Sequence, residues 1–210
     1  MANGYYESGM ADDIACFDMF FRQVPDGGGY AIMAGLDQVI SYLDNLEFTD
    51  EDIAYLEKKG IFSQEFLDYL REFRFTCDVW AIPEGTPIFP GEPLVTVKGP
   101  MIQAQFVETM IADRDFGVPA LGTMAHSWVQ MYASEYEAFR KYAEIYPDNC
   151  VLLVDTYNVL KSGVPAAIRV FDEVKPKNKG IRIDSGDVAY LTKKARKMLD
   201  DAGHRDCKIV

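Results

Sequence analysis

The chain is poor in the residues that build metal centres and disulfide frameworks. It has only two histidines, and its four cysteines are scattered without any Cys-x-x-Cys spacing, at Cys16, Cys77, Cys150 and Cys207. A structural zinc site is therefore not expected. Reduced thiols in a cytoplasmic protein are the simplest interpretation of this cysteine usage.

Long apolar runs and an excess of positive charge are also missing. No run is long enough to span a bilayer, and residues 1–5 are not expected to form a signal peptide. Lysine and arginine number 21 against 33 acidic residues, which gives a formal net charge of −12. This charge argues against a nucleic acid or an anionic membrane as the main partner. A small anionic substrate stays compatible with it, because a pocket can be locally basic in an acidic protein.

What is present points to an α/β fold in the second half of the chain. Apolar runs at 151–154, 181–183 and 208–210 alternate with helical patterns at 164–174 and 188–202. The first run is typical of a strand buried on both faces. This β-α-β-α-β order predicts parallel strands, whose carboxyl ends are where chemistry gathers in such folds.

The first half predicts a separate α+β unit that extends to about residue 110. Alternating or short apolar runs between Pro-Gly turns indicate strands, and capped amphipathic stretches indicate helices. The expected strands are 14–22, 79–82, 86–89 and 94–97, and the expected helices are 36–46, 49–60, 63–73 and 101–110.

Several polar residues follow the predicted parallel strands. Asp155, Asp184 and Asp187 are candidate magnesium ligands or stabilisers of a cationic transition state. The alternative is that they cap the following helices, Asp187 in particular. Arg182 lies between two isoleucines, where it would hold a carboxylate or phosphate, or form an internal ion pair with Asp155 or Asp184.

The two histidines receive different interpretations. His126 follows a Gly-Thr turn and is a candidate nucleophile or acid–base group. From its chemistry alone, a histidine satisfied by a neighbouring side chain is the favoured interpretation. His204 lies in a polar loop after Gly203 and is expected to be solvated, as is the basic stretch 193–197.

These stretches resemble the nicotinate phosphoribosyltransferases, a family of type II phosphoribosyltransferases. The resemblance covers essentially the whole chain. Its most specific blocks are Gly122-Thr123-Met124-Ala125-His126-Ser127, Val154-Asp155-Thr156-Tyr157 and Gly180-Ile181-Arg182-Ile183-Asp184-Ser185-Gly186-Asp187. Supporting blocks are 1–6, 20–22, 28–32, 73–76 and 83–86.

The resemblance implies an α/β barrel, of which 111–210 would form part, with an N-terminal α+β domain at 1–110, usually as a homodimer. It also implies a reaction that joins nicotinate to phosphoribosyl pyrophosphate, giving nicotinate mononucleotide and pyrophosphate for NAD salvage, with Mg2+ and with ATP as co-substrate. By motif, His126 would be transiently phosphorylated, Thr123 and Arg182 would hold nicotinate, and Asp155 and Asp184 would lie near the ribose, pyrophosphate and metal.

Against the family pattern, three segments are expected to be absent: one before Met1, one between Ile111 and Ala112, and one after Val210. Two alternatives to the enzyme therefore stay open. One is a non-catalytic fragment or interaction subunit derived from that family. The other, which rests on the βαβ pattern alone, is a different barrel enzyme acting on a phosphorylated sugar.

Overall fold

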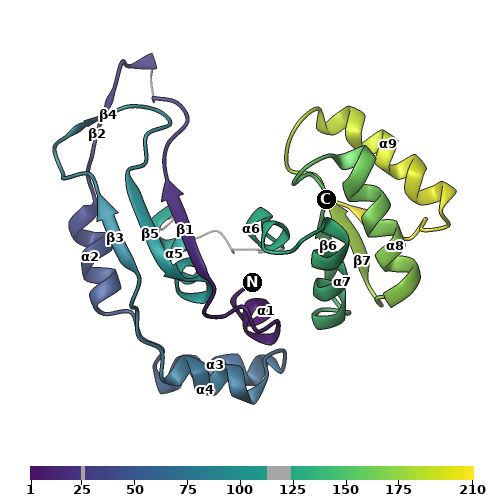
Figure 1. Cartoon of the computed structure of the whole chain (residues 1–210), viewed down its shortest axis with the longest axis horizontal. Coiled ribbons are helices and arrows are strands. Elements are labelled where there is room, and N and C mark those ends of the chain that lie inside the picture. Colours follow the sequence, from purple (N-terminus) through teal and green to yellow (C-terminus); the bar gives the residue numbers. More distant parts are fainter. Residues whose placement is uncertain (25–26, 113–123) are drawn as a thin grey trace. The chain divides into compact units, whose positions relative to one another are not determined.

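The computed structural model describes residues 1–24, 27–112 and 124–210 (Figure 1). The chain forms two compact units that divide between Gly117 and Val118. The described residues 2–112 are here the N-terminal unit, and 124–210 are the C-terminal unit. None of the described helices combines the length and the apolar character needed to cross a membrane.

The N-terminal unit contains two small antiparallel sheets. Strands β1 (Ile14–Met19), β5 (Val95–Pro100) and β3 (Asp78–Ala81) pair in that order, and β2 (Ala31–Ile32) pairs with β4 (Pro87–Ile88). The alternating exposure along β1 confirms its predicted pattern. The strand ends at Met19 rather than at residue 22, because its last partner, Val95, is the first residue of β5.

Five helices complete this unit. Thr49 caps α3 with the predicted reciprocal pair of hydrogen bonds to Asp52, and Ser63 caps α4. Ile53 of α3 packs with Phe66, Leu67 and Leu70 of α4 in a core cluster. The helices are α1 (Ala2–Glu7), α2 (Leu36–Asp44), α3 (Asp50–Lys59), α4 (Gln64–Arg71) and α5 (Met101–Ala112).

The C-terminal unit is the predicted parallel βαβαβ structure. Strands β6 (Cys150–Leu153), β7 (Lys179–Arg182) and β8 (Lys208–Ile209) form one sheet in that order, and both pairings are parallel. The α/β class with an N-terminal α+β unit is thereby confirmed. The helices of this unit are α6 (His126–Gln130), α7 (Glu135–Ile145), α8 (Val164–Val174) and α9 (Val188–Asp201).

A π-helix, η2 (Val159–Gly163), precedes α8 and was not predicted. The Asn158 carbonyl accepts hydrogen bonds from the amides of Ser162 at 3.0 Å and Gly163 at 2.9 Å. A Cβ atom at Gly163 would lie 2.0 Å from the Val154 carbonyl oxygen, so only glycine fits there. The turn after β6 is therefore pressed against the end of that strand.

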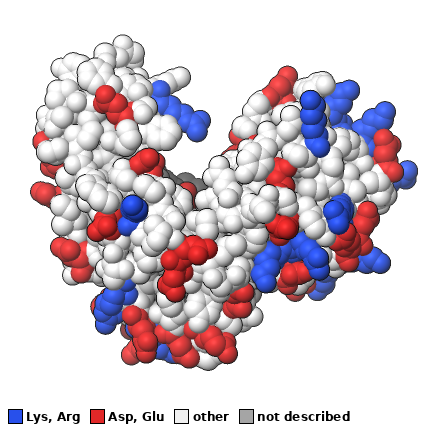
Figure 2. All heavy atoms as spheres, viewed as in Figure 1, with Lys and Arg blue, Asp and Glu red and all other residues white. Residues whose placement is uncertain are grey.

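Charge is mixed on the surface of the C-terminal unit. On the face shown in Figure 2, acidic and basic side chains are interspersed over this unit. The overall negative charge is thus not evenly spread over this face, because basic side chains lie among the acidic ones.

Candidate functional site

Two acids lie at the carboxyl ends of adjacent parallel strands. Asp155 is the second residue after β6, and Asp184 is the second residue after β7. The Asp155 Oδ2 atom accepts hydrogen bonds from the Asp184 amide at 3.0 Å and from the Ser185 hydroxyl at 2.6 Å. Its Oδ1 atom is buried and has no hydrogen-bond partner among the described residues. One carboxylate oxygen is fixed by the strand ends, and the other is buried and makes no hydrogen bond with the described residues.

Arg182 ends β7 beside these acids. Its Nη2 atom lies 2.9 Å from Asp184 Oδ1, with 33% and 49% of the two side chains exposed. This confirms the predicted alternative of an internal ion pair with Asp184. The Arg182 side chain is partly exposed because β7 ends at this residue. A pair this exposed contributes at most about 1 kcal/mol to stability. An anionic ligand can therefore compete for the guanidinium group.

His126 is brought to the same strand ends from α6. Its Nδ1 atom lies 3.2 Å from the hydroxyl oxygen of Thr156, the residue after Asp155. His126 is half-buried and thus has a neighbouring polar partner. The structure brings together His126, Asp155, Arg182 and Asp184, whereas Thr123 lies outside the described residues.

Asp187 does not join this group. Its carboxylate accepts a hydrogen bond from the Tyr190 amide at 3.0 Å, as the N-cap of α9. The helix-cap alternative is confirmed for this residue. Thr156 and Ser185 were not predicted as site residues from the sequence. Each directly follows a candidate acid in a polar stretch after a predicted strand, and this position could have indicated them.

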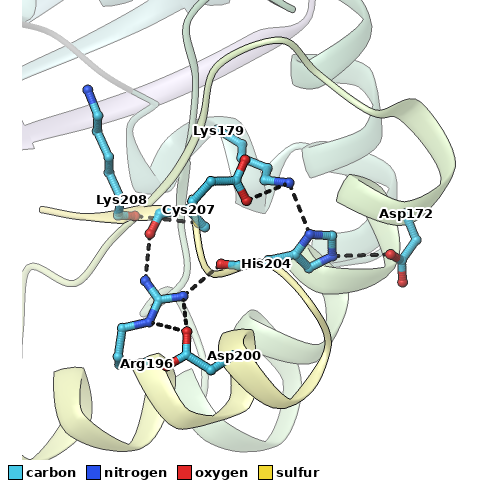
Figure 3. Close-up of polar contacts among 8 residues, drawn as sticks. Asp172, Lys179, Arg196, Asp200, His204, Cys207 and Lys208 are labelled. Atoms are coloured by element: carbon cyan, nitrogen blue, oxygen red, sulfur yellow. Dashed lines mark hydrogen bonds and ion pairs between the residues drawn. The ribbon is translucent and has the colours of Figure 1, made fainter.

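His204 is buried rather than solvated, so the sequence expectation is wrong (Figure 3). Its Nδ1 atom lies 3.1 Å from Lys179 Nζ, and its Nε2 atom lies 3.1 Å from Asp172 Oδ1, outside hydrogen-bond geometry. The His204 ring also packs edge-on against Phe171 of α8. The chain turns back at Gly203, and the His204 amide bonds to the Leu199 carbonyl at 2.8 Å, which directs the ring inward.

Arg196 corrects the expectation that 193–197 is wholly solvated. Its guanidinium donates to the carbonyl of Cys207 at 2.6 Å and to that of His204 at 2.7 Å (Figure 3). It also bonds to Asp200 at 2.9 Å. These contacts fix the loop that leads into β8, at the amino end of the sheet. The residues drawn in Figure 3 therefore form a cluster opposite to the candidate site.

The described residues contain no group of three or more histidine, cysteine or acidic side chains arranged to hold a metal ion. Mg2+ needs no such group, since it is often bound by one or two carboxylates together with water and substrate phosphates. Asp155, with a buried oxygen that lacks a partner, fits this mode of binding.

The comparisons with known proteins first define the fold. A crystal structure titled nicotinate phosphoribosyltransferase from Vibrio cholerae aligns with a TM-score of 0.69 at 15% identity, over 97% of this chain and 68% of that one. At this identity the likeness shows the fold alone. The class it defines is the α/β fold with an N-terminal α+β unit.

The sequence comparisons identify the family. The model for the nicotinate phosphoribosyltransferase (NAPRTase) N-terminal domain matches residues 1–113, more than half of the chain. The chain belongs to the nicotinate phosphoribosyltransferase family, which confirms the resemblance seen in its sequence.

Two relatives match along the whole chain. A nicotinate phosphoribosyltransferase of Bacillus subtilis is 37% identical over 271 residues, and one of Mycobacterium tuberculosis is 35% identical over 270. Both alignments cover 100% of this chain but only 55% and 58% of the relatives, so the chain spans little more than half their length. The alignment with the Bacillus subtilis relative has 271 positions, whereas this chain has 210 residues. At least 61 positions of that alignment therefore have no residue of this chain.

Proposed function

We propose that this chain carries the nicotinate phosphoribosyltransferase activity of its family. Nicotinate and phosphoribosyl pyrophosphate would give nicotinate mononucleotide and pyrophosphate, coupled to ATP hydrolysis, in NAD salvage. The observation that carries the proposal is Asp155, held through one oxygen at the strand ends beside Arg182, with its other oxygen buried and without a hydrogen-bond partner among the described residues.

The chemistry of the substrates suits these residues. Nicotinate is a flat ring with a carboxylate, for which the planar fork of Arg182 is a matching donor. In the reaction the ring nitrogen bonds to the sugar carbon while the bond from that carbon to pyrophosphate breaks. Positive charge develops on the ribose, and the carboxylates of Asp155 and Asp184 stabilise it.

Magnesium would neutralise the departing pyrophosphate. In this chain Asp155 is the group that would contribute to holding it, through the oxygen that has no protein partner. Asp184 is half-exposed beside it and is the second available carboxylate.

His126 is proposed as the residue that ATP phosphorylates, and Thr123 as a second contact to nicotinate. The small-molecule partners are thus nicotinate, phosphoribosyl pyrophosphate and ATP. We also propose a homodimer in the cytoplasm, where the four free cysteines would stay reduced.

The proposal is tested by incubating the 210-residue chain with nicotinate, phosphoribosyl pyrophosphate and Mg-ATP, and measuring nicotinate mononucleotide by mass spectrometry. ATP-stimulated product is expected. His126→Ala is expected to lose the stimulation by ATP while keeping some slow transfer. Stimulation that persists in His126→Ala would rule out the role of this histidine.

A second candidate is a non-catalytic fragment or interaction subunit of the same family. It is favoured by the 61 alignment positions without a counterpart and by the partial coverage of the relatives. The same assay separates the two candidates, because this one requires that the wild-type chain forms no product.

A further inference from the structure

A buried acid lies next to the candidate site and has no role in the chemistry proposed above. Glu135 is the first residue of α7 and is 6% exposed. The Tyr157 amide donates a hydrogen bond to its carboxyl group, which is also hydrogen-bonded to the Ser162 hydroxyl. The Oε1 atom is buried and has no hydrogen-bond partner among the described residues.

The two partners of Glu135 lie at opposite ends of the turn that follows β6. Tyr157 comes directly after Thr156, and Ser162 lies in η2. The turn is closed on itself, since the Asn158 side chain accepts from the Lys161 amide at 2.9 Å and the Ser162 hydroxyl donates to the Asn158 carbonyl at 3.0 Å. Glu135 therefore attaches an already closed turn to α7.

The same helix also holds His126 in place. Trp128, two residues after His126, is fully buried and donates from Nε1 to the Ala138 carbonyl of α7 at 2.9 Å. Its ring packs edge-on against Tyr142, at a centroid distance of 5.9 Å. Helix α7 thus contacts both α6 and the turn after β6. The two contacts bring His126 Nδ1 to 3.2 Å from the Thr156 hydroxyl.

We propose that Glu135 is a positioning residue, which sets Thr156 and Asp155 against His126 by fixing residues 155–158 to α7. It touches no substrate and acts through the Tyr157 amide and the Ser162 hydroxyl. Its effect on catalysis rests on the proposed function, whereas its effect on the turn does not. Burial raises the pKa of the Glu135 carboxyl group, which is the expected consequence of placing an acid where its hydrogen bonds are needed but its charge is not.

The turn is tested directly by hydrogen–deuterium exchange on the full 210-residue chain. Glu135→Ala removes the acceptor, and exchange of the 156–158 amides is expected to rise by about 3- to 10-fold, as for loss of a hydrogen bond between uncharged groups. Glu135→Gln keeps an acceptor oxygen in the same shape and is expected to retain wild-type protection. Glu137→Ala, the same change on the exposed side of the same helix turn, is the matched control and should also exchange like wild type.

Kinetics supplies the second readout if the wild-type chain forms product. Glu135→Ala is expected to lower kcat by about 100-fold, as for a small misplacement of catalytic groups, with KM for nicotinate unchanged. Glu135→Gln is expected to restore most of kcat. A chain that forms no product in any variant counts against the proposed function alone, and the exchange result still decides the role of Glu135.

Unchanged protection of residues 156–158 in Glu135→Ala would overturn the proposal, as would a Glu135→Gln variant that exchanges as fast as the alanine variant. Should Glu135→Ala not fold, Glu135→Asp replaces it, because this change keeps an acid but withdraws it by one methylene group from the Tyr157 amide. Faster exchange at Tyr157 in that variant supports the proposal, and wild-type exchange overturns it.

Discussion

The two ends of the parallel sheet in the C-terminal unit contain the same kinds of residue but differ in their polar contacts. Strand β7 begins with Lys179 and ends with Arg182, and each of these cations pairs with an aspartate, Lys179 with Asp206 at 3.1 Å and Arg182 with Asp184 at 2.9 Å. Each end also has one histidine. What differs is whether a charged group faces the buried atom that makes no hydrogen bond.

At the amino end the polar groups contact one another, although His204 Nε2 makes no hydrogen bond. His204 has a charged neighbour at each ring nitrogen, and the guanidinium of Arg196 bonds to two carbonyls and one carboxylate. At the carboxyl end one oxygen of Asp155 has no partner among the described residues. Residue type therefore does not distinguish the two ends. They differ in that a charged group, Asp172, faces the His204 nitrogen that makes no hydrogen bond, whereas Asp155 Oδ1 has neither an ion-pair nor a hydrogen-bond partner among the described residues.

The largest expected effect on kcat is at Asp155, at the carboxyl end of the sheet. Asp155→Ala should lower kcat by about 100- to 1000-fold, because it removes a preorganised charge beside the reacting carbon. Asp172→Ala, the matched change at the amino end, should leave kcat at the wild-type level. Steady-state assays of the two variants measure the difference, and equal losses in both would contradict it.

Arg182→Ala should have the next largest effect, about a 10- to 100-fold rise in KM for nicotinate, as expected for losing a charge-assisted hydrogen bond. Lys179→Ala removes the cation at the other end of the same strand. It should reduce the free energy of unfolding while KM stays unchanged. An unaltered nicotinate affinity in Arg182→Ala would contradict the proposal that this residue binds nicotinate.

Arg196→Ala tests whether the contacts at the amino end of the sheet stabilise the fold. Loss of the bonds to the His204 and Cys207 carbonyls should reduce the free energy of unfolding by about 2 kcal/mol. Lys197→Ala, the next residue on α9 and exposed, is the control and should change stability little. Chemical denaturation measures both, and equal stabilities of the two variants would show that the cluster at the amino end does not stabilise the fold.

The smallest expected effect concerns pH and Glu135. Burial raises the pKa of this carboxyl group above its usual value of 4.5. The native state therefore binds the proton more tightly than the unfolded state, so its stabilising effect is present below pH 4.5 and is lost as the pH rises through the raised pKa. Glu135→Gln, which stays uncharged, should gain stability relative to wild type as the pH rises from about 4.5 to neutral. Parallel denaturation curves across this range test the point, and a difference independent of pH would contradict it.

The sequence was sufficient for the parts of the fold that depend on local pattern. Apolar runs predicted β6, β7 and β8, and the helical pattern at 164–174 predicted α8. The position of Asp155 and Asp184 together followed from strand direction, because parallel strands end at the same edge.

The features that the sequence did not predict depend on contacts between distant segments. His204 is buried because it packs on Phe171 of α8, and Arg196 bonds to carbonyls in the loop beyond its own helix. The π-helix is set by the close approach of Gly163 to Val154. Neither hydrophobic periodicity nor capping chemistry carries information about such approaches.

The central claim is that the carboxyl ends of β6 and β7 bind the substrate. It is tested most directly by recording amide NMR spectra of the isotope-labelled 210-residue chain during titration with nicotinate. We predict saturable shifts at Asp184, Ser185 and Tyr157, with the signals of Lys179 and His204 unmoved. Shifts confined to the amino end of the sheet, or no saturable shift at any residue, would contradict the claim.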